Sequence, residues 1–167
     1  MKLRLLSWNA WGANDSSKRK VVKAMIRNQR VDLFCLQETK IQTMSEGVVR
    51  SLGSGRFLDW GAMDAHGSAG GILIYWDKRT LEVLEMEVGH FSISCRLRNV
   101  EDVLVWIFTG VYWQFSREDR EALWEELGAI RGIWNDPWCL GGDFNVILSQ
   151  RERSSWGRIS GAMRRFV

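Results

Sequence analysis

The sequence predicts a mixed α/β fold in which two packed, mixed β-sheets are flanked by helices, giving a four-layer α/β/β/α sandwich. Three observations lead to this fold class. A strand–helix–strand pattern opens the chain, several strand-like runs follow in its middle third, and a long amphipathic helix then precedes another short strand. A simple doubly wound sheet does not fit, because such a sheet alternates strands with helices throughout.

Four elements are predicted in the first third of the chain. Apolar runs predict one strand from Leu3 to Ser7 and another from Asp32 to Gln37. A helix is predicted between them, from Ser17 to Gln29. Its buried side would be formed by Val22, Met25 and Ile26. This order predicts parallel pairing of the two strands. A short helix is predicted near Met44 to Leu52.

The middle third predicts consecutive strands joined by short turns. The expected strands are Phe57 to Met63, Ile72 to Trp76, Leu81 to Val88, Phe91 to Leu97 and Val103 to Tyr112. Several of them alternate apolar and polar residues, most clearly from Leu81 to Val88. Alternation of this kind is typical of half-buried antiparallel strands, so a meander is expected here.

The last third begins with a predicted helix. Ser116 is a candidate N-cap, with Asp119 three residues later as a variant capping box. An apolar stripe follows at Leu123, Leu127, Ile130 and Trp134. Trp138 to Leu140 predicts a short buried strand, and Ile159 to Val167 is interpreted as the start of a further helix.

The composition predicts one globular domain over residues 1–167, since 46% of the residues are hydrophobic. The cysteines lie in apolar runs without CxxC spacing, which predicts buried free thiols and a reducing compartment; they are Cys35, Cys95 and Cys139. The apolar start turns polar at Ser7, too early for a signal peptide, and no run is long enough to cross a membrane. An intracellular protein is therefore expected.

The net charge of +3 is unevenly distributed. Helical spacing would place Lys20, Lys23, Arg27 and Arg30 in one stripe. That stripe is either a solvated helix face or a surface for a polyanion. The C-terminal segment is also basic, and contact with nucleic acid is predicted there for Arg151, Arg153 and Arg158.

Ten tryptophans are unusually many for 167 residues. Periodic apolar patterns predict core positions for Trp106, Trp124 and Trp134. Others lie beside polar motifs or in basic segments, namely Trp11, Trp113 and Trp156. For this second group the alternatives are packing in the protein and stacking on nucleic-acid bases.

Polar motifs stand where three of the predicted strands stop: Ser7-Trp8-Asn9, Gln37-Glu38-Thr39-Lys40 and Gly142-Asp143-Phe144-Asn145. If neighbouring strands contain them, two carboxylates and two amides would meet at one edge of a sheet. They belong to Asn9, Glu38, Asp143 and Asn145. Oxygen donors of this kind suit a hard cation such as Mg²⁺ and a phosphate bound to it.

Five motifs in this order resemble those of the endonuclease/exonuclease/phosphatase superfamily. They are Ser7-Trp8-Asn9, Gln37-Glu38-Thr39-Lys40, Gly70-Gly71-Ile72-Leu73, Thr109-Gly110-Val111-Tyr112 and Gly142-Asp143-Phe144-Asn145. Within that superfamily they are most similar to the endonuclease domain of plant LINE-type (non-long-terminal-repeat) retroelements. The resemblance covers nearly the whole chain but only the earlier part of the family domain.

The resemblance implies a role for each site residue. Glu38 would be the main ligand of Mg²⁺, with Mn²⁺ as an alternative metal, and Asn9 would lie beside it. Asp143 would position or deprotonate the attacking water, and Asn145 would hold that water and a phosphate oxygen. Tyr112 would contact the scissile phosphate. The opposing interpretations are surface acids at strand ends for the carboxylates, turn residues for the asparagines and a core position for the tyrosine.

The sequence departs from the family pattern in two places. Trp113-Gln114-Phe115 stands where the family tends to have a Gly-Pro-Asn turn, so Gln114, beside Trp113, is a candidate replacement for the phosphate-binding Asn. The family's later Asp and its Ser-Asp-His motif are absent, and neither His66 nor His90 matches the missing histidine. The chain is therefore interpreted as a C-terminally truncated domain.

Three functions stay open at this point. The resemblance implies an Mg²⁺-dependent DNA endonuclease that is a monomer or part of a polyprotein with a reverse transcriptase, and that is nuclear if functional. The alternatives are a repair endonuclease for abasic DNA or a phosphatase of the same superfamily, and a catalytically dead fragment.

Overall fold

The computed structural model describes residues 2–10, 12–13, 15–53, 55–66, 70–112, 116–142 and 163–166, the last of these for the backbone alone. Its helices are α1 (Ser16–Gln29), α2 (Glu46–Leu52) and α3 (Arg117–Ile133). Its strands are β1 (Leu5–Asn9), β2 (Leu33–Gln37), β3 (Leu58–Met63), β4 (Ile72–Asp77), β5 (Leu81–Val88), β6 (Ser92–Asn99), β7 (Val105–Val111), β8 (Trp138–Gly141) and β9 (Met163–Phe166).

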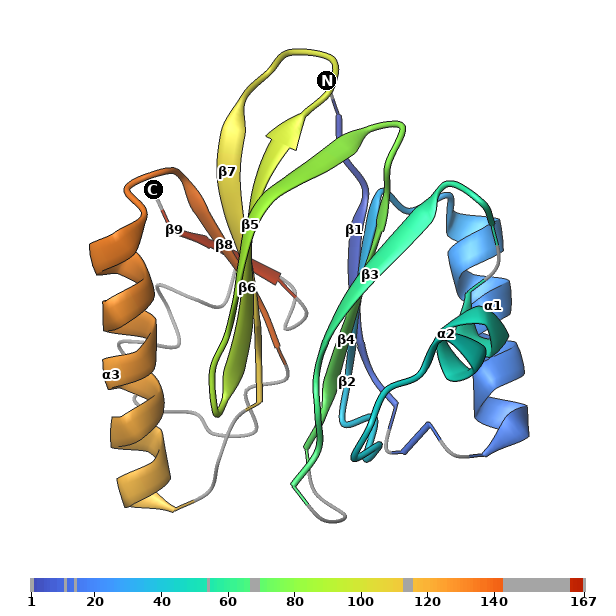
Figure 1. The fold of residues 1–167 in the computed structure, drawn as a ribbon, viewed down its shortest axis with the longest axis horizontal. Coiled ribbons are helices and arrows are strands. Elements are labelled where there is room, and N and C mark those ends of the chain that lie inside the picture. The colour runs from blue at the N-terminus through green and yellow to red at the C-terminus, as the bar shows by residue number, and fades with distance from the viewer. Residues whose placement is uncertain are drawn as a thin grey trace.

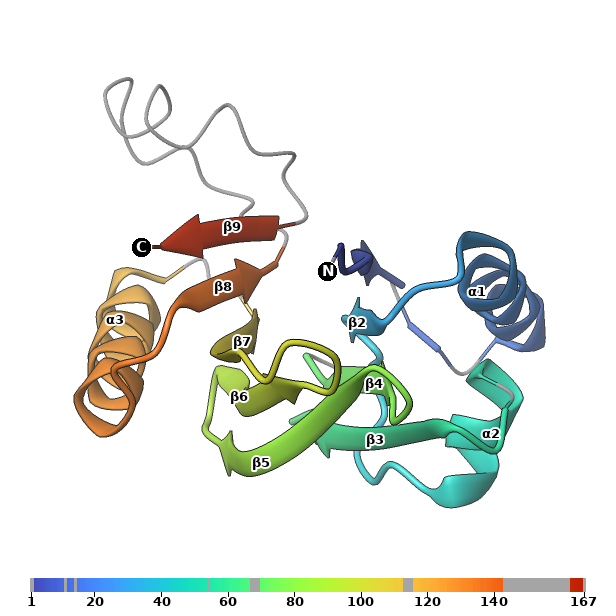
Figure 2. The ribbon, with the colours of Figure 1, turned by 90° about the horizontal axis from the view of Figure 1, so that it is seen from above.

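The strands form two sheets, with the order β1-β2-β4-β3 in one and β5-β6-β7-β8-β9 in the other. β1 pairs parallel with β2, and β7 pairs parallel with β8, while the other pairs are antiparallel. The two sheets face each other, with α1 and α2 outside the first and α3 outside the second (Figures 1 and 2). The predicted four-layer sandwich and the parallel pairing of the first two strands are confirmed.

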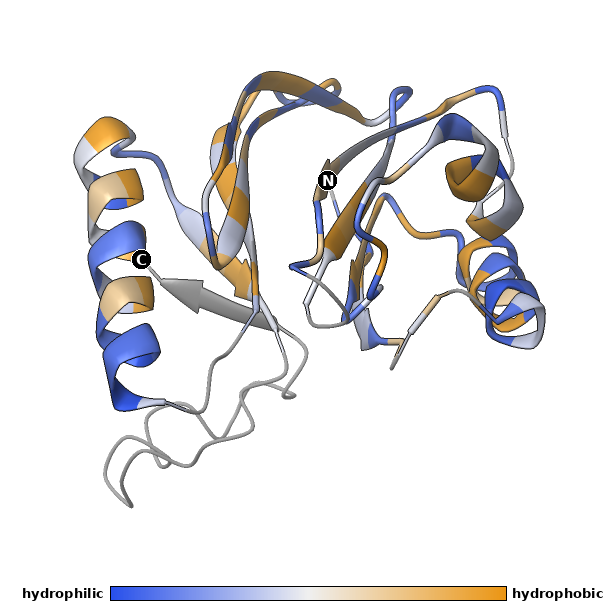
Figure 3. Ribbon diagram, turned by 60° about the horizontal axis from the view of Figure 1, so that its bottom comes forward, coloured by the Kyte–Doolittle hydropathy of each residue, from blue (hydrophilic) through white to orange (hydrophobic). Residues whose placement is uncertain are grey.

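Alternation along the strands separates three apolar layers. In β2, Leu33 and Cys35 belong to the central core between the sheets, whereas Phe34 and Leu36 pack toward α1 and α2. A third core lies between the second sheet and the apolar stripe of α3. Figure 3 shows the hydrophobic residues concentrated in the strands, while α3 carries hydrophilic turns on its exposed side. Burial of both faces explains why every residue of β4 is buried.

Local signals placed the described elements to within about two residues of the predicted ends. Ser116 caps α3, since its hydroxyl accepts a hydrogen bond of 3.1 Å from the backbone N–H of Asp119. The free cysteines are all buried, as predicted. Burial raises the pKa of Cys35 and of Cys95 to about 12, so both are neutral thiols at physiological pH. Among the described helices, none has the length and apolar character needed to cross a membrane.

Two predictions were wrong. The predicted helix start at Ile159 to Val167 includes a strand instead, β9, which pairs antiparallel with β8 and so satisfies the backbone groups on its free side. Trp124 is 40% exposed and is not a core residue, because it lies about 100° around α3 from its neighbour Leu123, which faces the sheet. Trp106 and Trp134 are buried as predicted.

The closest approach of the two sheets is expected to depend on Gly110. A Cβ atom there would lie 2.9 Å from Cys35 Sγ and 3.2 Å from Ile72 Cγ2, closer than packed atoms tolerate. Gly110→Ala should therefore lower the free energy of unfolding by about 1–3 kcal/mol, measured by urea denaturation.

Gly128→Ala is the matched control. Gly128 is exposed within α3, and a Cβ atom there would have no neighbour within 4 Å. This variant should be more stable than the wild type by about 0.5–1 kcal/mol, because alanine restricts the unfolded chain in a helix position. Equal stability of Gly110→Ala and the wild type would show that the two sheets are not packed as closely as described.

Candidate functional site

The strand ends that contain the polar motifs meet at one end of the sandwich. β1, β2, β7 and β8 all finish at the lower end of the molecule in Figure 1. Asn9 pairs with Gln37 in the β1–β2 register, and Gly110 pairs with Gly141 in the β7–β8 register. The parallel pairing within each sheet places these ends together, because parallel strands finish at the same edge.

Contacts across the two sheets join these ends into one site. A Cβ atom on Gly142, just after β8, would lie 3.4 Å from the side-chain nitrogen of Gln37 and 3.2 Å from the carbonyl oxygen of Val111. A Cβ atom on Gly70 would lie 3.4 Å from the ring of Tyr112, just after β7. The segments that contain Asn9, Glu38, Tyr112 and Gly142 are therefore neighbours in space.

The backbone around Glu38 adopts a conformation that residues with side chains rarely take. Glu38 has φ = 55° and Lys40 has φ = 56°, and the facing glycines, Gly70 and Gly71, have φ = 80° and 90°. A left-handed conformation costs a residue with a Cβ atom about 1–2 kcal/mol. Such strain interrupts the in-out alternation of β2 and redirects the residues that follow it.

Hydrogen bonds on both sides hold this strained segment. The Lys40 N–H donates to the Gly70 carbonyl at 2.8 Å, and the Thr39 N–H donates to the Gly71 carbonyl at 3.2 Å. On the other side, the Gly12 N–H donates to the Glu38 carbonyl at 2.7 Å. The Glu38 conformation is thus fixed by the fold, a feature that is common where a side chain must be placed for function.

The structure places some of the predicted site residues and leaves others outside its description. Asn9, Glu38 and Tyr112 are half-buried and lie at the shared end of the sandwich. The predicted catalytic and nucleic-acid-binding residues Asp143, Asn145, Trp113, Gln114, Arg151, Arg153 and Arg158 lie outside the described residues. Trp11 and Trp156 lie outside them as well. Lys20, Arg27 and Arg30 of the basic stripe are exposed on α1, which both of its interpretations require.

The donor atoms at this end suit a hard cation. Glu38 offers a carboxylate and Asn9 an amide oxygen, both of which are ligands for Mg²⁺ or Mn²⁺. Cys35 lies nearby but is buried between the sheets as a neutral thiol, so it does not add a soft ligand. Within the described ranges, no group of three or more His, Cys, Asp or Glu residues forms a complete metal site. The described residues thus fit part of an oxygen-ligand site.

The sequence did not indicate that His66 and His90 would approach each other. Their rings are 6.4 Å apart between centroids, although one follows β3 and the other lies between β5 and β6. Phe91 accepts a hydrogen bond of 2.7 Å from the Tyr112 N–H, which places this histidine pair beside the candidate site. No sequence signal joins two turns in different sheets, so only the packing of the sheets reveals the pair.

Glu126 of α3 fixes the turn that contains His90. Its carboxylate accepts hydrogen bonds from the N–H of His90 at 2.6 Å, from the N–H of Phe91 at 3.1 Å and from the Ser92 hydroxyl at 2.5 Å. A Cβ atom on Gly89 would lie 2.4 Å from this carboxyl group, so glycine is needed there. The second sheet is thereby held to α3 next to the site.

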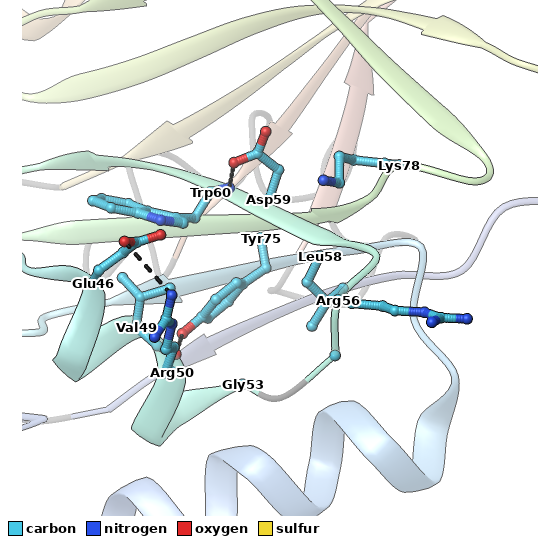
Figure 4. A pocket seen from close by; sticks show the side chains of 11 residues that line it. Glu46, Val49, Arg50, Gly53, Arg56, Leu58, Asp59, Trp60, Tyr75 and Lys78 are labelled. Carbon is cyan, nitrogen blue, oxygen red and sulfur yellow. Dashed lines mark hydrogen bonds and ion pairs between the residues drawn. The ribbon is translucent and has the colours of Figure 1, made fainter.

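A separate cavity of about 530 Å³ lies at the other end of the first sheet, between α2, β3 and β4. Its polar groups largely interact with one another (Figure 4). Arg50 pairs with Glu46 at 3.8 Å, Asp59 accepts a hydrogen bond from the Trp60 N–H, and the Tyr75 hydroxyl donates to the Val49 carbonyl. This cavity presents few groups that are free to select a ligand, so the strand-end site is the better candidate.

Comparisons with known proteins agree with this placement of the site. The family model described as "Endonuclease/Exonuclease/phosphatase family" matches residues 6–165. That range includes every strand end that contains a polar motif. No protein of curated function matches the chain in sequence.

Solved structures with the same fold include enzymes with different substrates. The mannosyl-6-phosphatase of Bacteroides thetaiotaomicron superposes with a TM-score of 0.67 at 15% identity, over 94% of this chain and 71% of its own. The catalytic domain of human nocturnin gives 0.66 at 15% identity, over 95% and 69%. An AP endonuclease from Leishmania major gives 0.64 at 15% identity, over 86% and 55%. At this identity the likeness establishes the fold alone.

Backbone strain at the site is expected to cost stability that glycine recovers. Lys40→Gly should raise the free energy of unfolding by about 1 kcal/mol relative to Lys40→Ala, because both variants lack the side chain but only glycine adopts φ = 56° without strain. Urea denaturation of the two variants measures this difference. Equal stabilities would contradict the strained conformation.

Proposed function

Because the chain belongs to the endonuclease/exonuclease/phosphatase family, we propose that it is a Mg²⁺-dependent phosphodiester hydrolase, specifically a DNA endonuclease of retroelement type. Members of this family are hydrolases that act on phosphodiester or phosphate bonds. The observation that supports the site most directly is the convergence of Asn9, the strained Glu38, Tyr112 and the end of β8, where the sequence continues into Asp143 and Asn145.

Each residue has a chemical task in this proposal. Glu38 and Asn9 offer oxygen atoms to the cation, which when bound would neutralise charge on the phosphate. Asp143 holds and deprotonates the water that attacks phosphorus in line with the leaving oxygen. Asn145 and Tyr112 donate hydrogen bonds to the phosphate oxygens, where negative charge increases in the transition state.

DNA is the proposed substrate for two reasons. The motifs Ser7-Trp8-Asn9 and Gly142-Asp143-Phe144-Asn145 are most similar to those of retroelement endonucleases. The basic residues of the C-terminal segment follow directly after the second motif, so phosphates on either side of the scissile bond would meet Arg151, Arg153 and Arg158. Trp113 and Gln114 follow Tyr112 and would contact a base and a phosphate, respectively.

The same reasoning proposes the cellular setting. A retroelement endonuclease would act as a monomer or within a polyprotein that also contains a reverse transcriptase, and it would need access to nuclear DNA. The alternative functions are an abasic-site endonuclease or a phosphatase. Structures that share this fold include a mannosyl-6-phosphatase and an AP endonuclease, so the fold itself permits either. A catalytically dead fragment is the third alternative.

The endonuclease proposal is tested by the nicking of supercoiled plasmid DNA in the presence of Mg²⁺. The wild-type chain should convert the plasmid to the open circular form, and EDTA should abolish this conversion. Glu38→Ala and Asp143→Ala should each lower the nicking rate by about 100-fold or more, because each removes a carboxylate that acts on the reacting groups.

Glu101→Ala is the matched control for these two variants. Glu101 is an exposed acid in the turn between β6 and β7, at the opposite end of the sandwich, so its removal should leave the nicking rate unchanged. If wild-type nicking is absent, or if it persists unchanged in the Glu38 and Asp143 variants, the catalytic proposal is wrong for this chain.

Substrate choice needs a second comparison with the same preparation. Cleavage rates should be measured on plasmid DNA, on a duplex with one abasic site and on a sugar phosphate. Nicking of undamaged plasmid without release of inorganic phosphate supports the retroelement type. A strong preference for the abasic duplex or the sugar phosphate would instead support the corresponding alternative.

A further inference from the structure

Gln37 has a buried side chain at the functional end of the central core. It is the last residue of β2 and is only 3% exposed. By strand alternation its side chain lies on the same face as Leu33 and Cys35, which belong to the apolar core between the sheets. The Gln37 carboxamide is thus a polar group in a position where the preceding residues on that face are apolar.

The nitrogen of this carboxamide has no hydrogen-bond partner among the described residues. Several other buried polar side chains in the sandwich are paired. Ser94 and Thr109 share a hydrogen bond of 2.7 Å, the Trp138 indole donates to Thr109 at 2.8 Å, and the Trp106 indole donates to Asn99 at 2.7 Å. A buried donor without an acceptor lowers stability, and its presence beside a functional site calls for an explanation.

The free donor is directed toward the end of β8. A Cβ atom on Gly142 would lie 3.4 Å from the Gln37 nitrogen, so the amide is in contact with the start of the Gly142-Asp143 motif. Glycine at position 142 leaves this approach open. The next residue in the sequence, Asp143, has a side chain that is an acceptor only when ionised, which matches an N–H₂ donor.

We propose that Gln37 is a positioning residue whose buried carboxamide donates a hydrogen bond to the Asp143 carboxylate and orients it toward the attacking water. This inference rests on the proposed function of Asp143. The arrangement is a fixed donor behind a reacting carboxylate, since β2 holds Gln37 in the core while the carboxylate faces the substrate. The bond also favours the ionised form of Asp143, which accepts a proton from water.

Gln37→Met tests the proposal, because methionine has nearly the same length and volume but no N–H donor. The variant should stay folded with little change in melting temperature, and kcat for nicking should fall by about 10–100-fold with KM unchanged, as expected for loss of an orienting hydrogen bond. Ser7→Ala is the matched control. It removes another buried polar group from the same face of the first sheet, further from the site, and should leave kcat unchanged.

Gln37→Glu gives a second readout. The carboxyl group that this substitution introduces can still donate to Asp143 when it is protonated, whereas in its ionised form it cannot donate and repels Asp143. The activity of Gln37→Glu relative to the wild type should therefore rise as the pH is lowered. A residue with a purely structural role would give the same relative activity at every pH.

A thermal double-mutant cycle tests the contact without any measurement of activity. Asp143→Ala should lower the melting temperature more in the Gln37 background than in the Gln37→Met background, because only the first leaves a buried donor without an acceptor. If the wild-type chain does not nick DNA, the proposed function fails while this cycle still decides the contact. An equal effect of Asp143→Ala in both backgrounds overturns the Gln37 inference, as does Gln37→Met with wild-type kcat.

Discussion

The apolar layer between the two sheets is the interaction on which the rest of the structure depends. Leu33, Cys35 and Ile72 of the first sheet pack against residues such as Phe108 of the second. Gly110 lets the two sheets approach closely beside Cys35, at the end where the candidate site lies. Because this layer sets the relative position of the sheets, it also determines which strand ends meet. The helices cover the outer faces, and each outer layer has its own apolar core with its sheet.

The site end departs from the regular packing in several ways at once. Glu38 and Lys40 adopt left-handed backbone conformations, and Gln37 buries a donor that has no acceptor among the described residues. Each departure lowers stability, yet all three residues are consecutive or nearly so, next to the chemistry that the family implies. Further from this end, buried polar groups such as those of Ser94 and Thr109 pair with each other. A concentration of unfavourable features at one place is typical of a site maintained for function.

The fold does not decide the substrate. A mannosyl-6-phosphatase, the catalytic domain of nocturnin and an AP endonuclease share this arrangement at 15% identity. What differs between such enzymes must lie in the groups around the shared strand ends. In this chain the rim includes the His66–His90 pair, which Glu126 helps to fix beside Tyr112. Substrate selection therefore depends on these turns and on the segments that follow Tyr112 and Gly142 in the sequence.

The sequence alone determined the order and type of the described elements up to β8, the N-cap at Ser116 and the positions of Asn9 and Glu38 at strand ends, since these follow from local periodicity and from motifs. The tertiary structure decided what depends on contacts between distant segments. Strand β9 replaces part of the predicted helix because pairing with β8 outweighs a local preference, and Trp124 is exposed because of its angle on α3. The strain at Glu38, the free donor of Gln37 and the approach of His66 to His90 arise only when two sheets pack together. No pattern along one chain can indicate the distance between side chains in different sheets.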